Sequence, residues 1–138
     1  MYTIEEFDKQ KTKVFKYIIF KKRTESEIRN KFGMQIEEDM LEDIIEYLKE
    51  AGYINDYNFI ERQVNEYINL KTMSIQEIKY KLLSKGIEKK LIDKYIEEHR
   101  EELQEYEEES AERIRTKKSS QMDEKEIEQY LYKKGYKI

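Results

Sequence analysis

A short helix pattern recurs three times along the chain, at intervals of about 50 residues. Each copy begins with a capping box, in which a side-chain oxygen accepts the N–H three residues on and a glutamate reaches back to the capping residue. The boxes start at Thr24, Ser74 and Asp123. Each glutamate is followed by an isoleucine, and each pattern is followed by a glycine and an apolar residue: Gly33 with Met34, Gly86 with Ile87 and Gly135 with Tyr136. We predict three helices that end in left-handed glycines, with the next apolar residue packing back.

A second stripe follows the first two of these helices. Ile36, Met40, Leu41, Ile44 and Ile45 recur 51 residues later as Ile87, Leu91, Ile92, Tyr95 and Ile96. This spacing is typical of a helix with one buried face. A further apolar helix precedes each capping box, and the one in the second unit is predicted to be capped by Asp56.

The sequence therefore predicts an all-α fold of tandem three-helix repeats that stack into an elongated, curved array. The predicted repeats are residues 1–55 with a short N-terminal extension, residues 56–100, and residues 101–138, the third lacking its last helix. Each unit is too small to bury a sizeable core alone, so the units are expected to stack on one another.

The composition supports helices and excludes several classes of protein. The chain of 138 residues has no proline and four glycines, and its 42% charged residues are balanced by 38% hydrophobic ones at helical spacing, which argues against disorder. It has no cysteine for disulfides or thiolate sites. No apolar run is long enough to cross a bilayer and the start does not resemble a signal peptide, so we expect a cytoplasmic protein.

The net charge of −4 conceals bands of opposite sign. Residues 9–31 contain nine Lys/Arg and two acids, whereas residues 36–66 contain ten acids and two bases. The alternation continues to the end of the chain, and it would align the basic bands of a bent stack into a stripe for a polyanion or an acidic groove. The predicted partner-binding residues are Lys21, Lys22, Arg23, Tyr57, Arg62, Tyr67, Lys71, Arg113, Arg115, Lys117, Lys118, Lys133 and Lys134. The alternative is that these cations belong to solvated faces with local glutamate partners.

Twelve tyrosines also suggest base stacking, but most of them fit packing positions. Tyr17, Tyr47, Tyr95 and Tyr130 fall on apolar stripes, and Tyr53 and Tyr136 follow glycines. Tyr57 and Tyr67, beside the junction of the first two repeats, are the exceptions.

No residue pattern indicates catalysis. His99 is the only histidine and lies in a run of charged residues, which favours an exposed helix end over a metal ligand. Carboxylates are too numerous to single out a catalytic pair, and there is no glycine-rich phosphate loop or nucleophile elbow. We expect no enzyme activity, no metal or other cofactor, no small-molecule substrate and no membrane partner.

The order and spacing of these features resemble the RecX regulatory proteins of bacteria over roughly residues 12–138. Residues 47–59, YLKEAGYINDYNF, are similar to that family's junction between repeats, and residues 78–87, IKYKLLSKGI, are similar to its Ile-x-x-x-Leu-x-x-Lys-Gly-Ile segment, which is echoed at 127–136. The resemblance implies a protein that binds the RecA filament on single-stranded DNA, inhibits its ATPase and strand exchange, and thereby acts in DNA recombination and repair.

The resemblance supplies no catalytic residues. The partner it implies is the RecA filament, with weak contact to single-stranded DNA, and we expect a monomer. Two alternatives stay open: a direct DNA-binding module of helix-turn-helix type, since capped three-helix units also describe that class, and a helical adaptor for another protein.

Overall fold

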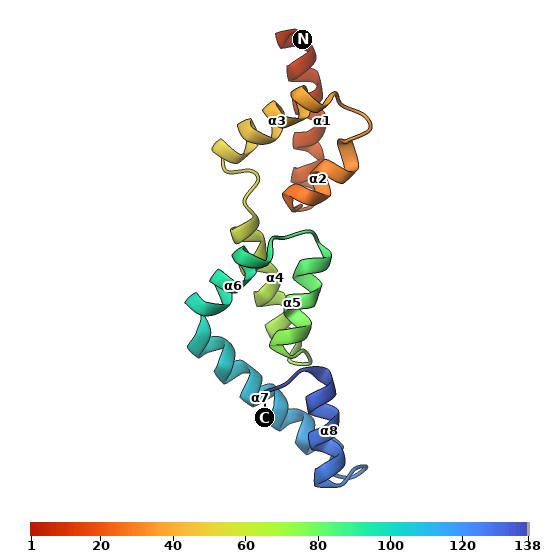
Figure 1. Ribbon diagram of the computed structural model, residues 1–138, viewed down its shortest axis with the longest axis vertical. Helices are drawn as coiled ribbons and strands as arrows, with labels where there is room; N and C mark the ends of the chain where they lie inside the picture. The colour runs from red at the N-terminus through yellow and green to blue at the C-terminus, as the bar shows by residue number, and fades with distance from the viewer. Residues whose placement is uncertain (138) are drawn as a thin grey trace. The chain divides into compact units, whose positions relative to one another are not determined.

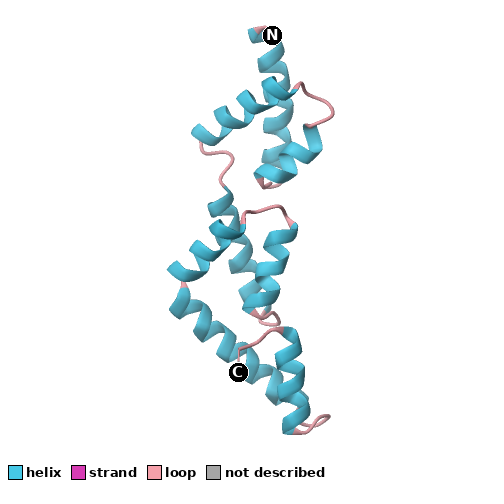
Figure 2. Ribbon diagram, viewed as in Figure 1, coloured by secondary structure: helices cyan, strands magenta, loops and turns pink. Residues whose placement is uncertain are grey.

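The structure of the chain is a computed structural model, which describes residues 1–137. These residues form helices joined by loops and contain no strand (Figures 1 and 2), so the predicted all-α class is confirmed. The helices are α1 (Ile4–Phe20), α2 (Glu25–Phe32), α3 (Glu38–Glu50), α4 (Asp56–Leu70), α5 (Ile75–Ser84), α6 (Lys89–Glu98), α7 (Arg100–Lys118) and α8 (Glu124–Lys134).

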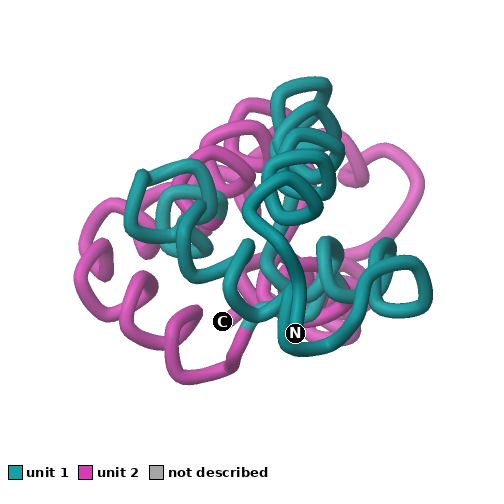
Figure 3. The backbone as a smooth tube through the Cα atoms, turned by 90° about the horizontal axis from the view of Figure 1, so that it is seen from above, with its two compact units in different colours: residues 1–59, 85–87 teal, residues 60–84, 88–138 magenta. Residues whose placement is uncertain are grey.

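The chain divides into two compact units (Figure 3). Unit 1 comprises Met1–Phe59 and Lys85–Ile87, and unit 2 comprises Ile60–Ser84 and Glu88–Ile138, of which Ile138 is outside the described residues. The boundary between the units falls within α4. The units are groups of residues that contact one another, whereas the predicted repeats 1–55, 56–100 and 101–138 are based on sequence periodicity and stay a prediction.

The three predicted helix starts are confirmed. Thr24 and Asp123 form complete capping boxes at α2 and α8. At α5, the Glu77 N–H donates to Ser74 Oγ at 3.1 Å and the Ser74 N–H donates to Glu77 Oε1 at 2.9 Å. These bonds satisfy N–H groups that have no partner within a helix, so short helices begin at fixed residues.

The prediction of a left-handed glycine at the end of α2 is wrong. Gly33 has φ −58° and ψ −28°, and Met34 is 98% exposed rather than packed. The chain instead continues through a right-handed turn, in which the Ile36 N–H donates to the Phe32 carbonyl at 3.0 Å. This turn carries Ile36 into the core, which outweighs the conformational freedom of the glycine. Gly86 and Gly135 do have positive φ, at 82° and 96°.

The core of unit 1 lies between α1, α2 and α3. Buried residues at the predicted spacings form one apolar cluster: Val14, Ile18, Ile28, Phe32, Ile36, Met40, Leu41, Ile44, Ile45, Leu48 and Ile54. Tyr17 packs edge-on against Phe32, with ring centroids 5.5 Å apart, at the margin of this cluster. Packing of these amphipathic faces therefore places α2 and its capped end.

The N-terminus of α2 is closed by residues from later in the chain, within unit 1. Thr24 is completely buried, and its Oγ1 donates to the Lys85 carbonyl at 2.8 Å. The Glu25 N–H donates to Asp56 Oδ1 at 3.0 Å. The prediction that Asp56 caps α4 is therefore wrong: Asn55 caps it, since the Asn58 N–H donates to Asn55 Oδ1 at 3.0 Å.

Unit 2 repeats this arrangement at the N-terminus of α5. Ser74 is completely buried and its Oγ donates to the Lys134 carbonyl at 2.7 Å. The Ile75 N–H donates to Glu107 Oε2 at 2.8 Å, and Glu107 Oε1 also accepts the Lys137 N–H at 2.9 Å. Two short helices thus meet end to end in unit 2, with the carbonyl end of α8 at the N–H end of α5, an arrangement favoured by their dipoles.

Candidate partner-binding surfaces

Unit 1 presents two of its predicted binding cations at the end of α1. Lys21 and Lys22 are exposed, and they follow Phe20, which is also exposed. Arg23 differs, because its guanidinium carbon lies 4.3 Å from the centre of the Tyr17 ring and its Nε is buried with no hydrogen-bond partner among residues 1–137. Lys21 and Lys22 can therefore contact a partner freely, whereas Arg23 is held by packing.

Glu25, in the first turn of α2, is the acidic residue that follows these cations in the sequence. Glu25 forms ion pairs with Arg29 and Lys49. Burial alone would raise the pKa of Glu25, but its hydrogen bonds and charge interactions with Lys49 and Arg29 outweigh burial and lower it. The negative charge of Glu25 is thus balanced by Arg29 and Lys49 within unit 1.

The two predicted tyrosines are half-buried. Tyr57 lies in the first turn of α4. Tyr67 lies near the end of the same helix, 5.9 Å from Lys81 Nζ, and its pKa is raised by burial and by the charge of Glu66. Arg62, on the same helix, is exposed.

Of the tyrosines assigned to packing, Tyr95 and Tyr136 are buried, as predicted. Tyr47 and Tyr53 are only partly covered, at 48% and 46% exposure. Tyr53 still packs edge-on against Phe15, with ring centroids 4.8 Å apart.

Unit 2 brings five of the predicted cations together around one cavity of about 180 Å³. Lys71 comes from the turn after α4, Arg113, Lys117 and Lys118 from α7, and Lys134 from α8. Residues from three separate segments thus produce a concave surface of one sign. No acidic side chain lines this cavity. We call it the basic cavity.

Two predicted cations of the same region lie outside the basic cavity. Arg115 forms ion pairs with Glu128 at 3.0 Å and Glu112 at 3.3 Å, and the hydrogen bond to Glu128 is the main cause of its raised pKa. Lys133 is exposed on α8 and does not line the cavity. Arg115 therefore fits the alternative given for the predicted cations, in which a cation is paired with nearby glutamates and does not bind a partner.

Sequence reasoning missed Tyr130 as a site residue by assigning it to packing. Its ring lines the basic cavity and lies 4.9 Å from Lys118 Nζ. The available signal was position: Tyr130 lies four residues before Lys134 on α8, so both share one helix face.

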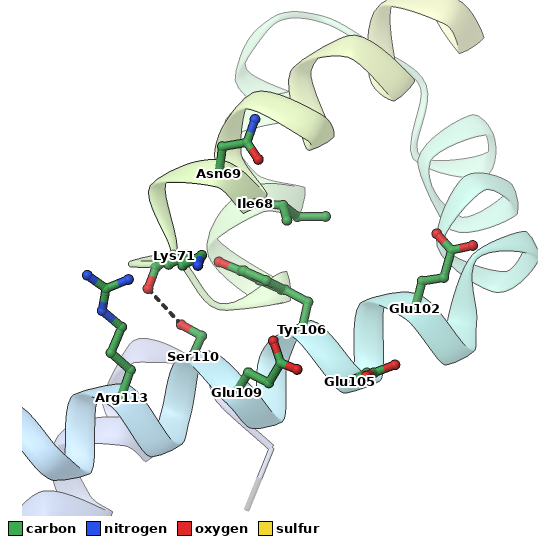
Figure 4. A pocket seen from close by; sticks show the side chains of 9 residues that line it. All are labelled: Ile68, Asn69, Lys71, Glu102, Glu105, Tyr106, Glu109, Ser110 and Arg113. Atoms are coloured by element: carbon green, nitrogen blue, oxygen red, sulfur yellow. Dashed lines mark hydrogen bonds between the residues drawn. The ribbon is translucent and has the colours of Figure 1, made fainter.

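An acidic cavity of about 350 Å³ adjoins the basic one (Figure 4). Lys71 and Arg113 line both, and Ser110 between them donates from Oγ to the Lys71 carbonyl at 3.1 Å. Figure 4 shows three glutamates following α7 away from Arg113: Glu109, Glu105 and Glu102. The charge of the surface along α7 therefore changes from basic near Arg113 to acidic near Glu102.

A metal site has no support in the described part of the chain. Residues 1–137 contain no group of three or more His, Asp or Glu side chains arranged to hold a metal ion. The His99 ring stacks on Tyr95 at 4.0 Å between centroids, and its Nδ1 lies 2.9 Å from the Tyr95 carbonyl. None of the helices within residues 1–137 is both long enough and apolar enough to cross a membrane.

Several proteins named regulatory protein RecX are similar to this chain in sequence. No family model matches the chain. The regulatory protein RecX of Finegoldia magna is 35% identical over 83 residues, which are 59% of this chain and 40% of that protein. RecX of Clostridium beijerinckii is 34% identical over 93 residues, 67% of this chain and 43% of that protein. These matches span only about two fifths of each relative.

A third relative and a crystal structure match almost the whole chain. RecX of Caldanaerobacter subterraneus subsp. tengcongensis is 28% identical over 137 residues, 96% of this chain and 67% of that protein. The crystal structure of RecX from Lactobacillus salivarius superposes with a TM-score of 0.80 at 24% identity, covering 98% of this chain and 91% of that one. The structural match shows a shared fold.

Proposed function

The chain belongs to the RecX family of regulatory proteins, and we propose that it binds the RecA filament on single-stranded DNA and inhibits filament growth, ATP hydrolysis and strand exchange. In this proposal it acts by occupying the filament and performs no catalysis of its own. The observation that carries the proposal is the presence, in a chain of this family, of cationic residues grouped on each unit: Lys21 and Lys22 on unit 1 and the basic cavity on unit 2.

Two surfaces support binding to an anionic assembly. In unit 1, Lys21 and Lys22 are exposed at the end of α1. In unit 2, the basic cavity gathers five cations from three segments. A filament that carries DNA offers phosphates and acidic side chains, so these cations would speed its capture, and their effect would weaken with added salt.

The direct test is the single-stranded-DNA-dependent ATPase of RecA, measured with increasing amounts of the purified chain. We expect inhibition at stoichiometric amounts, and a rate unchanged at those amounts would refute the proposal. A double substitution, Lys21→Glu with Lys22→Glu, should weaken inhibition several-fold, because it reverses two exposed charges and leaves the packed Arg23 intact. The matched control is Lys125→Glu, which reverses an exposed charge on α8.

Direct DNA binding is the second candidate, and the basic cavity favours it. The two functions differ in what they require: a DNA-binding module must bind naked DNA tightly, whereas a filament regulator needs only weak contact. A salt titration of binding to naked DNA distinguishes them, since tight binding that falls steeply with salt, with no effect on RecA, would support the second candidate.

A further inference from the structure

The cations of the basic cavity are largely without acidic partners. Within residues 1–137, no carboxylate forms an ion pair with Lys71, Arg113 or Lys117. Lys118 lies over the Tyr130 ring, and only Lys134 is paired, with Glu77 Oε1 at 2.9 Å. Like charges brought together by a fold repel one another, so an anion that entered the cavity would be strongly favoured.

Lys71 adds an independent observation, because its backbone is strained. It has φ +56°, and it is the one non-glycine residue of 1–137 in the left-handed region. Its N–H donates to the Ile68 carbonyl at 3.0 Å and its carbonyl accepts the Ser110 hydroxyl, so the turn is held from both sides. Glycine is the residue that suits this conformation, and strained side-chain-bearing residues are concentrated at functional sites.

We propose that the basic cavity binds a phosphate group, and that Lys71 occupies a position suited to glycine because its ammonium group is one of the ligands. Arg113 would supply a forked pair of donors, and Lys117 a further cation one helical turn along α7. The proposal concerns contact between this chain and a phosphate alone, so it holds or fails independently of the action on RecA.

A phosphate suits this cavity better than an acidic protein surface does. Five cationic residues line a volume of about 180 Å³, and three of them, Lys71, Arg113 and Lys117, have no carboxylate partner among residues 1–137; this size suits one compact anion with several oxygens rather than carboxylates spread over a surface. The adjoining acidic cavity, with Glu102, Glu105 and Glu109, would repel a second anionic group on that side (Figure 4). The phosphate could belong to a nucleic-acid backbone or to a free oligophosphate.

The experiment measures binding of the full chain to fluorescent oligo(dT) and to tripolyphosphate at several salt concentrations. Lys71→Gln, Lys71→Gly and the double substitution Arg113→Gln with Lys117→Gln should each weaken binding about fivefold or more. The slope of log affinity against log salt for oligo(dT) should flatten by about 0.7 for each bond to a backbone phosphate that a substitution removes. Lys125→Gln, outside the cavity lining, is the control and should bind as the parent does.

Lys71→Gly separates a ligand from a structural residue. Because glycine relieves the strain, this variant should melt at a higher temperature than the parent while binding phosphate more weakly, whereas Lys71→Gln should lose binding without the rise. Loss of oligo(dT) binding alone assigns the site to a nucleic-acid backbone, and loss of tripolyphosphate binding alone assigns it to a free oligophosphate.

The proposal is overturned if the parent binds neither probe, if Lys71→Gly binds as the parent does, or if Lys125→Gln weakens binding as much as the cavity variants. It is also overturned if poly-glutamate binds in a Lys71-dependent manner while both phosphate probes do not, since the cavity would then select an acidic protein.

Discussion

Glu107 on α7 should be one of the residues whose loss destabilises unit 2 most. It is only 7% exposed, and its two carboxylate oxygens accept the N–H groups of Ile75 and Lys137 at 2.8 and 2.9 Å. One carboxylate therefore holds the first turn of α5 and the segment after α8 together. Glu107→Ala removes both bonds and leaves two backbone donors facing a gap.

The magnitude follows from these two bonds. A hydrogen bond to a charged group contributes about 1.5–3 kcal/mol to stability. Water can reach part of the gap, because Ile75 is half-buried and Lys137 is exposed, so the lower end of that range applies to each bond. Glu107→Ala should then cost about 3 kcal/mol, a large share of the roughly 5–15 kcal/mol typical of a folded domain. Glu107→Gln should cost about half as much, since its amide oxygen can still accept one N–H.

Urea unfolding followed by circular dichroism measures the free-energy difference, and amide exchange of Ile75 and Lys137 localises it. The matched control is Glu108→Ala, the exposed neighbour on the same helix, which should change stability by less than about 0.5 kcal/mol. If Glu107→Ala costs no more than this control, or if the two amides exchange as in the parent, the carboxylate does not hold unit 2 in the way described.

Three further predictions concern backbone strain and pH. Gly86→Ala should lower the free energy of unfolding of unit 1 by roughly 2 kcal/mol or more, because φ is +82° and the new Cβ would lie 2.2 Å from Ser26 Oγ. Gly52→Ala is the control: φ is +83°, but no atom lies within 4 Å of the new Cβ, so it should cost only about 1 kcal/mol. Urea unfolding measures both differences. Burial raises the pKa of Asp56, so stability falls as pH rises through that pKa, where the folded state holds more protons than the unfolded state. Asp56→Asn should abolish this fall and be neutral or stabilising at pH 7, since its amide oxygen can still accept the Glu25 N–H; destabilisation equal to that of Asp56→Ala would contradict this. Burial raises the pKa of Tyr136 from 10 to about 12, so stability should fall by up to about 2.7 kcal/mol between those pH values, and Tyr136→Phe should flatten this part of a pH titration of unfolding.

Much of the fold was predictable because helix boundaries depend on neighbouring residues. A capping box is complete within four positions, so Thr24, Ser74 and Asp123 could each be identified without knowledge of tertiary structure. The apolar stripes could be identified for the same reason, since helical spacing alone decides which residues share a face. These local signals were enough to predict the class of the fold.

The failures occur where tertiary contacts override a local preference. Gly33 adopts a right-handed conformation because the turn that contains it carries Ile36 into the core. Asp56 does not cap α4, because its carboxylate accepts the N–H of Glu25 at the start of α2, and Asn55 caps α4 instead. The left-handed Lys71 has no signal in the sequence, since lysine is not favoured there. Each of these outcomes depends on a segment that is distant in the chain or on the packing of the core.

The candidate site shows the same division. Arg113, Arg115 and Lys117 were grouped by charge, yet only the first and last line the basic cavity. Helix geometry could have separated them, because residues four apart share a face and residues two apart do not. Lys71 and Lys134 were among the predicted cations, but their position beside the cations of α7 could not be predicted, since three separate segments must pack before these side chains meet.

Phosphate binding and the stability of unit 2 should be linked through Lys71. Its side chain lines the basic cavity, while its carbonyl accepts a hydrogen bond from Ser110 on α7, so the cavity exists only when α4, α7 and α8 are packed together. A ligand that binds only the folded state stabilises it by about 2.7 kcal/mol at about a hundred times its Kd. That gain is comparable to the loss expected from Glu107→Ala, so a saturating phosphate ligand should largely restore the unfolding midpoint of that variant. At the same ligand concentration this gain should fall to about 1.8 kcal/mol or less when Lys71→Gly is added, because a site at least fivefold weaker is then at most about 20-fold saturated over its Kd.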